Sequence, residues 1–253
     1  MNPADAKSLA SKINEIFPGV YSIADPKNPN KKLLATRNLT AGRVYHGEHT
    51  VRLGIRGETF EFRFWDPFRS KLSAAILRGL EVMPFEEGTA CLYLGASTGT
   101  TVSHLSDIVG NSGRIFAVEM APRVARELLE NVARFRKNIV PIIADARHPE
   151  GFPSVYGTIT AIYCDIAQPD QTEIAIANCR KFFGSKPSVL FLVVKASSID
   201  VLKDKGKVFG EQSKILKLAG FQILQKIDLQ PYDKNHAMII AQMSKDSNDK
   251  QTQ

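Results

Sequence analysis

The sequence predicts an α/β protein in which helices cover both faces of a mostly parallel β-sheet, preceded by a small antiparallel β unit. Two observations lead to this prediction. From residue 66 onward, short apolar runs alternate with longer segments whose apolar residues recur at helical spacing. Between about residues 20 and 65, β-prone runs alternate instead with turns rich in Gly, Asn and Pro. The chain has 253 residues, 43% of them hydrophobic, which is enough for one sizeable core.

Residues 1–65 are expected to form an N-terminal helix and a small antiparallel β domain. Apolar residues at helical spacing predict a helix over residues 4–17, and Pro18-Gly19 would end it. Five β-prone runs follow, at residues 20–23, 32–37, 43–47, 50–55 and 59–65. The last run alternates strictly, which places Phe60, Phe62 and Phe64 on one face of the sheet.

Residues 66–243 are expected to form the main domain. Its first helix, at 66–80, would be capped by Asp66 with Pro67 in the first turn. Strands are predicted at 90–94, 114–118, 139–143, 159–164 and 188–194, and helices at 100–109, 122–136, 170–182 and 207–219. Two last strands, at 221–229 and 236–243, have no helix between them, so a terminal antiparallel hairpin completes a seven-stranded sheet. The polar residues 244–253 are expected to be a disordered tail.

Composition and charge argue against a membrane-spanning or secreted protein and favour a partner that is negatively charged. No apolar run approaches the roughly 20 residues that cross a bilayer, and the first residues do not resemble a secretory signal. Cys91 and Cys164 lie in apolar runs, where buried reduced thiols are expected, so we predict an intracellular protein. Residues 31–78 hold ten Lys or Arg against four acids, which is +6 of the net charge of +7. Such a segment favours a polyanion such as nucleic acid, and solvated strand faces are the alternative.

Polar or glycine residues follow each predicted parallel strand. In open α/β sheets, ligands bind beyond the carboxyl ends of the strands. The residues at these five positions are, in strand order, the loop at 95–99, Glu119, Asp145, Asp165 and Lys195. Because these strand ends meet on one rim of the sheet, we expect the five to form one site.

The loop in YLGASTGTTVSHLSDIVG (93–110) indicates what that site holds. Gly95 and Gly99 lack the middle glycine of a dinucleotide loop, and no lysine follows Gly99 as in a triphosphate-binding loop. The carboxylate and ammonium of S-adenosylmethionine need only close backbone approach and hydroxyls, which Thr100 and Thr101 would supply at a helix N-terminus.

Two carboxylates at the ends of the next two predicted strands fit the adenosine part of S-adenosylmethionine. Glu119 would accept the two ribose hydroxyls, and Asp145 would accept from the adenine amino group. Each alone is an ordinary turn or cap residue. Together, after this loop, they favour a methyl donor.

Five stretches of the chain strongly resemble the fibrillarin family. They are PFRSKL (67–72), the loop segment 93–110, DARHP (145–149), DIAQPDQ (165–171) and PYDKNHA (231–237). The resemblance runs from about residue 30 to about residue 243. It is greatest to the archaeal form, because a Gly/Arg-rich N-terminal extension is absent. It implies a Rossmann-like class I S-adenosylmethionine-dependent methyltransferase fold behind a small β-rich N-terminal domain. Met120 departs from the family pattern, where an aromatic residue is common, and the loop reads AST rather than AAS.

The resemblance also implies a reaction and its setting. Family members transfer a methyl group from S-adenosylmethionine to the ribose 2′-hydroxyl of rRNA and tRNA. They act in a particle with a box C/D guide RNA, a Nop-family scaffold protein and a kink-turn-binding ribosomal-protein homologue. For this chain we therefore expect guide-directed activity in the cytoplasm of an archaeal cell, with weak or no activity without the partners.

The family's Lys-Asp-Lys-His set falls on Lys71, Asp165, Lys195 and His236. Lys195 is the expected general base or stabiliser of the alkoxide, because a second lysine nearby lowers a lysine pKa while Asp165 opposes that shift. Lys71 and His236 would position the hydroxyl and a phosphate. The predicted cofactor-binding residues are Gly95, Ala96, Gly99, Thr100, Thr101, Glu119, Met120, Asp145, Ala146, Asp165 and Gln168.

Other patterns in the chain are less informative. The run His46-Gly47-Glu48-His49 is interpreted as hairpin surface, and no cluster has metal-ligand spacing, so no metal is predicted. RNA contact is expected from residues 31–78, and the lack of aromatic platforms leaves sequence readout to guide pairing. Two alternatives stay open. One is a non-catalytic protein that docks RNA or a scaffold, and the other is a methyltransferase for small molecules.

Overall fold

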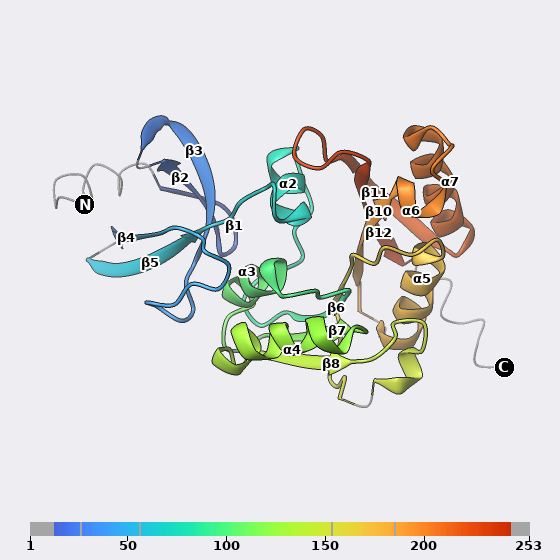
Figure 1. Ribbon diagram of the computed structural model, residues 1–253, viewed down its shortest axis with the longest axis horizontal. Coiled ribbons are helices and arrows are strands. Elements are labelled where there is room, and N and C mark those ends of the chain that lie inside the picture. Colours follow the sequence, from blue (N-terminus) through green and yellow to red (C-terminus); the bar gives the residue numbers. More distant parts are fainter. Residues whose placement is uncertain (1–12, 26, 56, 153, 185, 244–253) are drawn as a thin grey trace.

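The computed structural model describes residues 13–25, 27–55, 57–152, 154–184 and 186–243. Two β-sheets organise this part of the chain (Figure 1). The N-terminal sheet has five strands, and the second sheet has seven strands with helices on both sides. This arrangement confirms the fold class predicted from the alternation of apolar runs.

The N-terminal sheet is antiparallel throughout, in the spatial order β1-β2-β3-β5-β4. Its strands are β1 (Asn14–Phe17), β2 (Val20–Asp25), β3 (Asn28–Arg37), β4 (Thr50–Ile55) and β5 (Glu58–Phe64). The predicted alternation in β5 is confirmed. Phe62 is completely buried with Ile23 and Leu53, while Phe60 and Phe64 pack against this small core.

Two predictions for the N-terminal region are wrong. Residues 14–17 of the predicted helix form β1, and the helix positions up to residue 12 lie outside the described residues. Gly19 has φ +73° and donates its amide to the Glu15 carboxylate at 2.8 Å, so the chain turns back into β2 as a hairpin. The predicted strand at 43–47 is a loop, because the amides of Tyr45 and His46 donate to the Glu48 carboxylate instead of to a strand.

The seven-stranded sheet has the order β11-β12-β10-β9-β6-β7-β8. Strand β12 runs opposite to the other six strands and is antiparallel to both β10 and β11, which confirms the predicted terminal hairpin. Its strands are β6 (Ala90–Leu94), β7 (Arg114–Glu119), β8 (Ile139–Ile143), β9 (Ala161–Cys164), β10 (Val189–Lys195), β11 (Phe221–Asp228) and β12 (His236–Met243). These bounds lie within two residues of the predicted ones.

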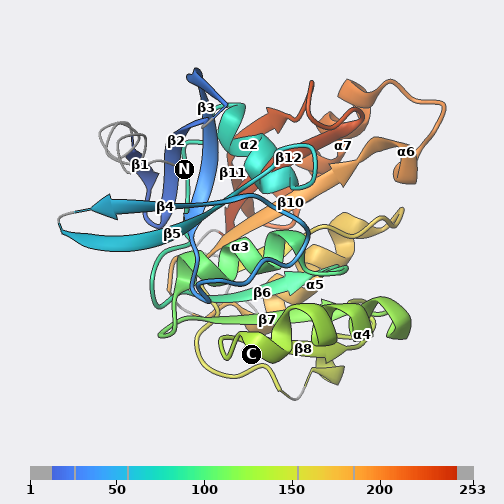
Figure 2. The ribbon, with the colours of Figure 1, turned by 60° about the vertical axis from the view of Figure 1, so that its left-hand side comes forward.

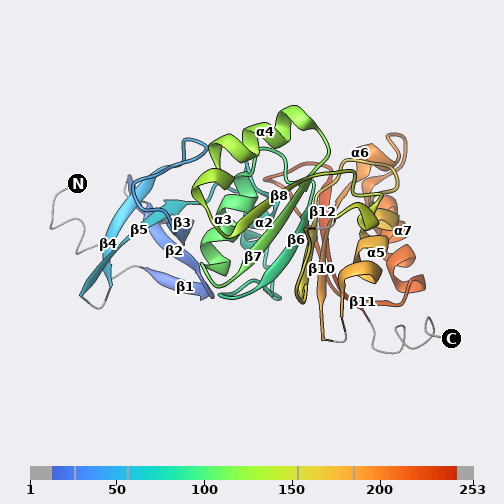
Figure 3. The same ribbon diagram turned by 90° about the horizontal axis from the view of Figure 1, so that it is seen from below.

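Helices cover both faces of this sheet, as Figure 3 shows. On one face lie α2 (Lys71–Leu77), α3 (Thr100–Val109) and α4 (Pro122–Asn131), and on the other α5 (Gln171–Phe182), α6 (Ala196–Ile199) and α7 (Lys205–Leu218). Short 3₁₀ turns follow at Ala133–Phe135 and Pro149–Gly151. Along β6, Tyr93 packs into the core under the first face, while Leu92 and Leu94 pack into the core under the second. No helix of the described residues is long and apolar enough to cross a membrane.

The helix expected at 66–80 is shorter than predicted, and it begins at Lys71. Asp66 does not cap it. Its carboxylate accepts the Phe68 amide at 2.9 Å and its carbonyl accepts the Arg69 amide at 3.2 Å, so residues 66–69 form a separate turn. Ser70 then takes the N-cap position, and Lys71 becomes the first residue of α2. The turn thereby places a lysine at the start of a helix that faces the sheet.

The order of strands reverses between β6 and β9, and the two chain segments touch there. Gly95 follows β6 with φ +80°, and a Cβ at this position would lie 2.4 Å from the carbonyl oxygen of Asp165. Real Cβ atoms do not approach backbone this closely, and positive φ disfavours other side chains. Only glycine therefore allows the loop after β6 to meet the residue that follows β9.

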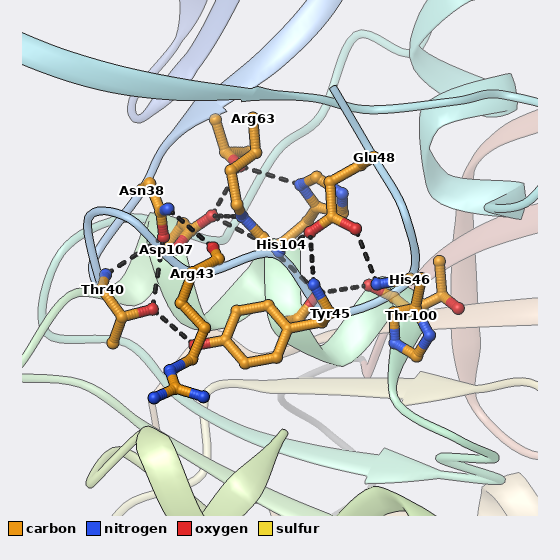
Figure 4. Close-up of polar contacts among 12 residues, drawn as sticks. Asn38, Thr40, Arg43, Tyr45, His46, Glu48, Arg63, Thr100, His104 and Asp107 are labelled. Carbon is orange, nitrogen blue, oxygen red and sulfur yellow. Dashed lines mark hydrogen bonds and ion pairs between the residues drawn. The ribbon is translucent and has the colours of Figure 1, made fainter. Parts of the chain in front are cut away.

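The N-terminal sheet lies next to α3 (Figure 2), and a buried ion cluster fastens the two together (Figure 4). The Asp107 carboxylate, whose side chain is completely buried, lies 2.9 Å from Arg63 of β5 and 2.7 Å from Arg136. It also accepts hydrogen bonds from the Thr36 hydroxyl of β3 and the Leu39 amide. Buried charges are tolerated only when paired and hydrogen-bonded. Asp107 therefore sets how the two sheets meet.

We expect Asp107→Ala to lower the free energy of unfolding by about 3–5 kcal/mol, because it removes the carboxylate partner of the buried Arg136 and leaves the buried Arg63 with Glu48 alone. Urea denaturation followed by the fluorescence of Trp65, the only tryptophan, measures this change. Glu130→Ala removes an exposed carboxylate and should change stability by less than about 0.5 kcal/mol. An Asp107→Ala protein as stable as the control would contradict the role given to the cluster.

Candidate functional site

A cavity of about 220 Å³ opens beyond the carboxyl ends of the parallel strands β6, β7, β8 and β9. All four strand exits contribute to it, as expected for an open α/β sheet. The sequence-predicted cofactor residues that line it are Gly95, Glu119, Met120, Asp145, Ala146, Asp165 and Gln168. Residues from distant parts of the sequence are thus brought to one place.

Glu119, at the end of β7, is held by the backbone around it. Its two carboxylate oxygens accept the amides of Ser97 and Ala121, each at 2.9 Å. Ser97 has φ +50°, which turns its amide toward Glu119. A carboxylate has about four acceptor positions, so each oxygen keeps capacity for a further donor in the cavity. The arrangement suits a pair of neighbouring hydroxyl groups.

Asp145 follows β8 and accepts the Arg147 amide at 2.9 Å. The Arg147 guanidinium lies 3.6 Å from the Asp145 carboxylate and donates to Asp170 and to the side-chain oxygen of Gln168. Arg147 lines the cavity and was not among the sequence-predicted residues. Its place in DARHP, directly after the predicted acidic residue, was the available signal. Arg147 links the segment after β8 to the segment before α5.

The other predicted loop residues support the cavity from behind. The amides of Gly95 and Ala96 both donate to the Val118 carbonyl, and Ala96 is buried. Gly99 has φ +93°, and a Cβ there would lie 2.6 Å from the Leu128 side chain of α4. The two threonines do not line this cavity with their hydroxyls, contrary to the sequence prediction. The Thr101 hydroxyl is hydrogen-bonded to the Ser70 hydroxyl at 2.9 Å, and Thr100 borders a different cavity.

A lysine and an aspartate meet at the edge of the cavity. The Lys71 ammonium at the start of α2 lies 2.9 Å from the Asp165 carboxylate at the end of β9. Both side chains are roughly a quarter exposed, so the pair can reach a bound molecule. The buried hydrogen bond from Ser70 to Thr101 ties the start of α2 to the start of α3. The position of Lys71 is therefore coupled to the loop at 95–99.

Lys195 and His236 form a second pair on the same edge. Lys195 ends β10, His236 begins β12, and the two are directly opposite in the antiparallel register. This confirms that the last strand starts on the rim. His236 contacts the Asp233 carboxylate through Nδ1, and the Lys195 amide donates to the Gln171 side chain at 3.2 Å. No hydrogen bond joins these two side chains to Lys71 or Asp165 among the described contacts.

The segment His46–His49 is not the hairpin surface that the sequence predicted. Figure 4 shows Glu48 turned inward, and its carboxylate forms an ion pair with the buried Arg63. His104, also in Figure 4, donates through Nδ1 to the Thr36 hydroxyl oxygen at 2.8 Å, because that hydroxyl donates its own hydrogen to Asp107. Burial holds the pKa of His104 well below the ordinary value. In the described part of the chain, no three His, Cys, Asp or Glu residues are placed to hold a metal ion.

The cysteines agree with the sequence prediction. Cys91, Cys164 and Cys179 are buried free thiols. Burial raises the pKa of Cys91 to about 12, and it raises that of the other two as well. Thiols in such surroundings stay protonated and inert. They belong to the core and not to the site.

The donor set of the cavity fits an adenosine attached to an amino acid. Two carboxylates are available for hydroxyl and amino hydrogens, and Val118, Ala144 and Ile166 supply apolar walls. The missing Cβ of Gly95 leaves room for close approach between Asp165 and the loop. Among the described residues that line the cavity there is no lysine, and its one cation, Arg147, is already paired with Asp170.

Comparisons with known proteins agree with this geometry. The family model named Fibrillarin matches residues 11–245. A fibrillarin-like rRNA/tRNA 2′-O-methyltransferase of Saccharolobus islandicus is 47% identical over 208 residues, which cover 82% of this chain and 87% of that protein.

Two solved structures are similar along nearly the whole chain. The Aeropyrum pernix fibrillarin with natively bound S-adenosyl-L-methionine gives a TM-score of 0.78 at 39% identity, and covers 91% of this chain and 99% of its own. The fibrillarin in a fibrillarin/Nop5p complex gives 0.75 at 36% identity, and covers 90% and 99%. The fold is thus the class I methyltransferase fold with an N-terminal antiparallel sheet. From the family model and these identities, the chain belongs to the fibrillarin family.

Proposed function

We propose that this chain is an enzyme that transfers a methyl group from S-adenosylmethionine to the ribose 2′-hydroxyl of rRNA and tRNA. The observation that carries the proposal is the meeting of a carboxylate-lined cavity with the Lys71–Asp165 pair at one edge of the sheet. The relative from Saccharolobus islandicus is named for this reaction, and the structure from Aeropyrum pernix holds this methyl donor.

The cofactor is held by residues at the strand exits. Glu119 accepts its ribose hydroxyls, and Asp145 accepts from its adenine amino group. Met120 and Ala146 flank the adenine, and Gln168 closes the other side of the cavity. S-adenosylmethionine supplies an electrophilic methyl group on a sulfonium. We retain the predicted contacts of Thr100 and Thr101 through their amides at the N-terminus of α3. The amides of Ala96 and Gly99 donate to the carbonyls of Val118 and Ala96, so these two residues shape the loop.

The acceptor hydroxyl is handled by the Lys-Asp-Lys-His set. A ribose 2′-hydroxyl is a weak nucleophile and must lose its proton as it attacks. Because Asp165 is engaged with Lys71, we assign the role of proton acceptor to Lys195. Lys71, fixed by Asp165, stabilises negative charge on the 2′-oxygen. His236 donates through Nδ1 to Asp233, which leaves Nε2 as an acceptor that orients the 2′-hydroxyl.

The partners follow the family. A fibrillarin/Nop5p complex supports a Nop-family scaffold for this chain. We further propose a box C/D guide RNA and a kink-turn-binding protein in the same particle, because nothing in the site reads base edges. We place the particle in the cytoplasm of an archaeal cell, since the relatives come from archaea. We retain the proposed domain boundaries. Residues 1–65 are the N-terminal domain, residues 66–243 are the methyltransferase domain, and residues 244–253 are a tail.

Methyl transfer in a reconstituted particle tests the function. The particle is assembled from the chain, the scaffold protein, the kink-turn-binding protein and a guide RNA, and labelled S-adenosylmethionine is added. We expect label on one ribose of the paired target RNA, and none when that nucleotide is 2′-deoxy. Label found only on small acceptor molecules would support the small-molecule alternative. Binding of RNA with no transfer would support the non-catalytic alternative.

We expect Asp165→Asn to slow methyl transfer by about 10²-fold or more, because the neutral amide no longer fixes the Lys71 ammonium at 2.9 Å. Single-turnover rates in the particle measure the effect. Glu211→Gln is the matched control, since it removes the carboxylate of an exposed Lys–Glu pair at 3.1 Å on α7. If both variants were as fast as the unchanged chain, the role of Asp165 would be disproved.

A further inference from the structure

A second cavity, of about 720 Å³, lies between the N-terminal sheet and the start of α2. It is separate from the cofactor cavity and has a different character. Its walls come from β3, the loop at 46–49, the turn at 66–69 and the segment before β12. A volume of this size is typical of a pocket that encloses a ligand. The proposed methyl-transfer chemistry does not use it.

An aromatic pair borders this cavity. The rings of Phe68 and Tyr232 meet edge to face, with centroids 5.3 Å apart and planes at 71°. Phe68 is 70% exposed, which is unusual for a large apolar side chain. Phe68 lies three residues before Lys71, and Tyr232 lies four residues before His236. The pair therefore joins the two segments that carry catalytic candidates.

Three basic side chains on the wall of this cavity have no acidic partner among the described residues. Lys31, Lys32 and Arg69 line it and are exposed, and no ion pair of theirs occurs among the described contacts. The Arg69 guanidinium instead donates to the His46 carbonyl at 2.6 Å, which holds the loop against the turn.

The acids on the same wall are occupied. Glu48 forms an ion pair with Arg63, and Asp66 accepts the Phe68 amide. Asp25 accepts the Lys27 amide. The charge of Glu48 is compensated by Arg63, while Asp25 and Asp66 stay charged, so the three cations outnumber the two uncompensated acids by one and the wall remains positive.

We infer that this cavity binds a nucleotide of the target RNA beside the methylated ribose, with its base turned out of the stack onto Phe68. The inference rests on the proposed function. An exposed aromatic ring stacks on any base, so the contact positions the RNA without reading its sequence. Lys31, Lys32 and Arg69 hold the adjoining phosphates. The aromatic platform that the sequence did not predict is thus assembled from two distant segments.

The test uses a target RNA with 2-aminopurine beside the target nucleotide, in the reconstituted particle. We expect the 2-aminopurine emission to be quenched by the unchanged chain and to recover with Phe68→Ala. The same variant should bind target RNA about five- to a hundredfold more weakly, with unchanged binding of S-adenosylmethionine. Phe68→Trp should retain quenching and affinity. Leu218→Ala, which removes an 80% exposed side chain on α7, is the control and should have no effect.

Methyl transfer tests the proposed function, while 2-aminopurine quenching and RNA affinity test the base-binding inference. If the unchanged chain methylates the RNA but Phe68→Ala quenches and binds it equally well, the inference is overturned and the proposed function stands. If Phe68→Ala loses the scaffold protein while RNA binding is unchanged, the cavity is a protein-docking surface and the inference is again overturned. If the base stacks on Phe68 but no methyl group is transferred, the inference holds for RNA binding and the proposed function fails.

Discussion

The close approach of Gly95 to Asp165 is the constraint on which the whole site depends. It occurs where the strand order reverses, so the loop after β6 and the residue after β9 lie against each other. The same loop is tied to β7, because the amides of Gly95 and Ala96 share the Val118 carbonyl. Glu119 is the next residue after Val118 in the chain. A backbone frame therefore sets the spacing between Glu119, which lines the strand-exit cavity, and Asp165, which pairs with Lys71.

The N-terminal sheet contributes to the site through a second, independent constraint. Asp107 pairs with arginines from two sides of the interface, and its burial makes other arrangements of the two sheets costly. The turn at 66–69 leaves this sheet and leads directly into α2. As a result, Phe68 and Arg69, which line the second cavity, lie just before Lys71 at the start of α2. The proposed RNA contact and the proposed catalytic lysine are thus placed by one turn of the chain.

Much of the fold could be predicted from local patterns. Apolar runs of five to seven residues and helical spacing located the sheet and its helices, and the strand exits located a cavity, because both depend on short-range regularity. The errors arose where distant segments decide the structure. Asn14–Phe17 has helical spacing but pairs with β2, and Asp66 has a cap-like position but closes its own turn. Phe68 and Tyr232 look unremarkable in sequence, and only the folded chain brings them together.

The central claim is that the strand-exit cavity holds S-adenosylmethionine through Glu119 and Asp145. Calorimetric titration of the isolated chain with S-adenosylmethionine tests it most directly, beside Glu119→Ala and Asp145→Ala. The account predicts binding by the unchanged chain that each substitution weakens about tenfold or more, since each removes hydrogen bonds to a charged group. Equal affinity in all three proteins would contradict it.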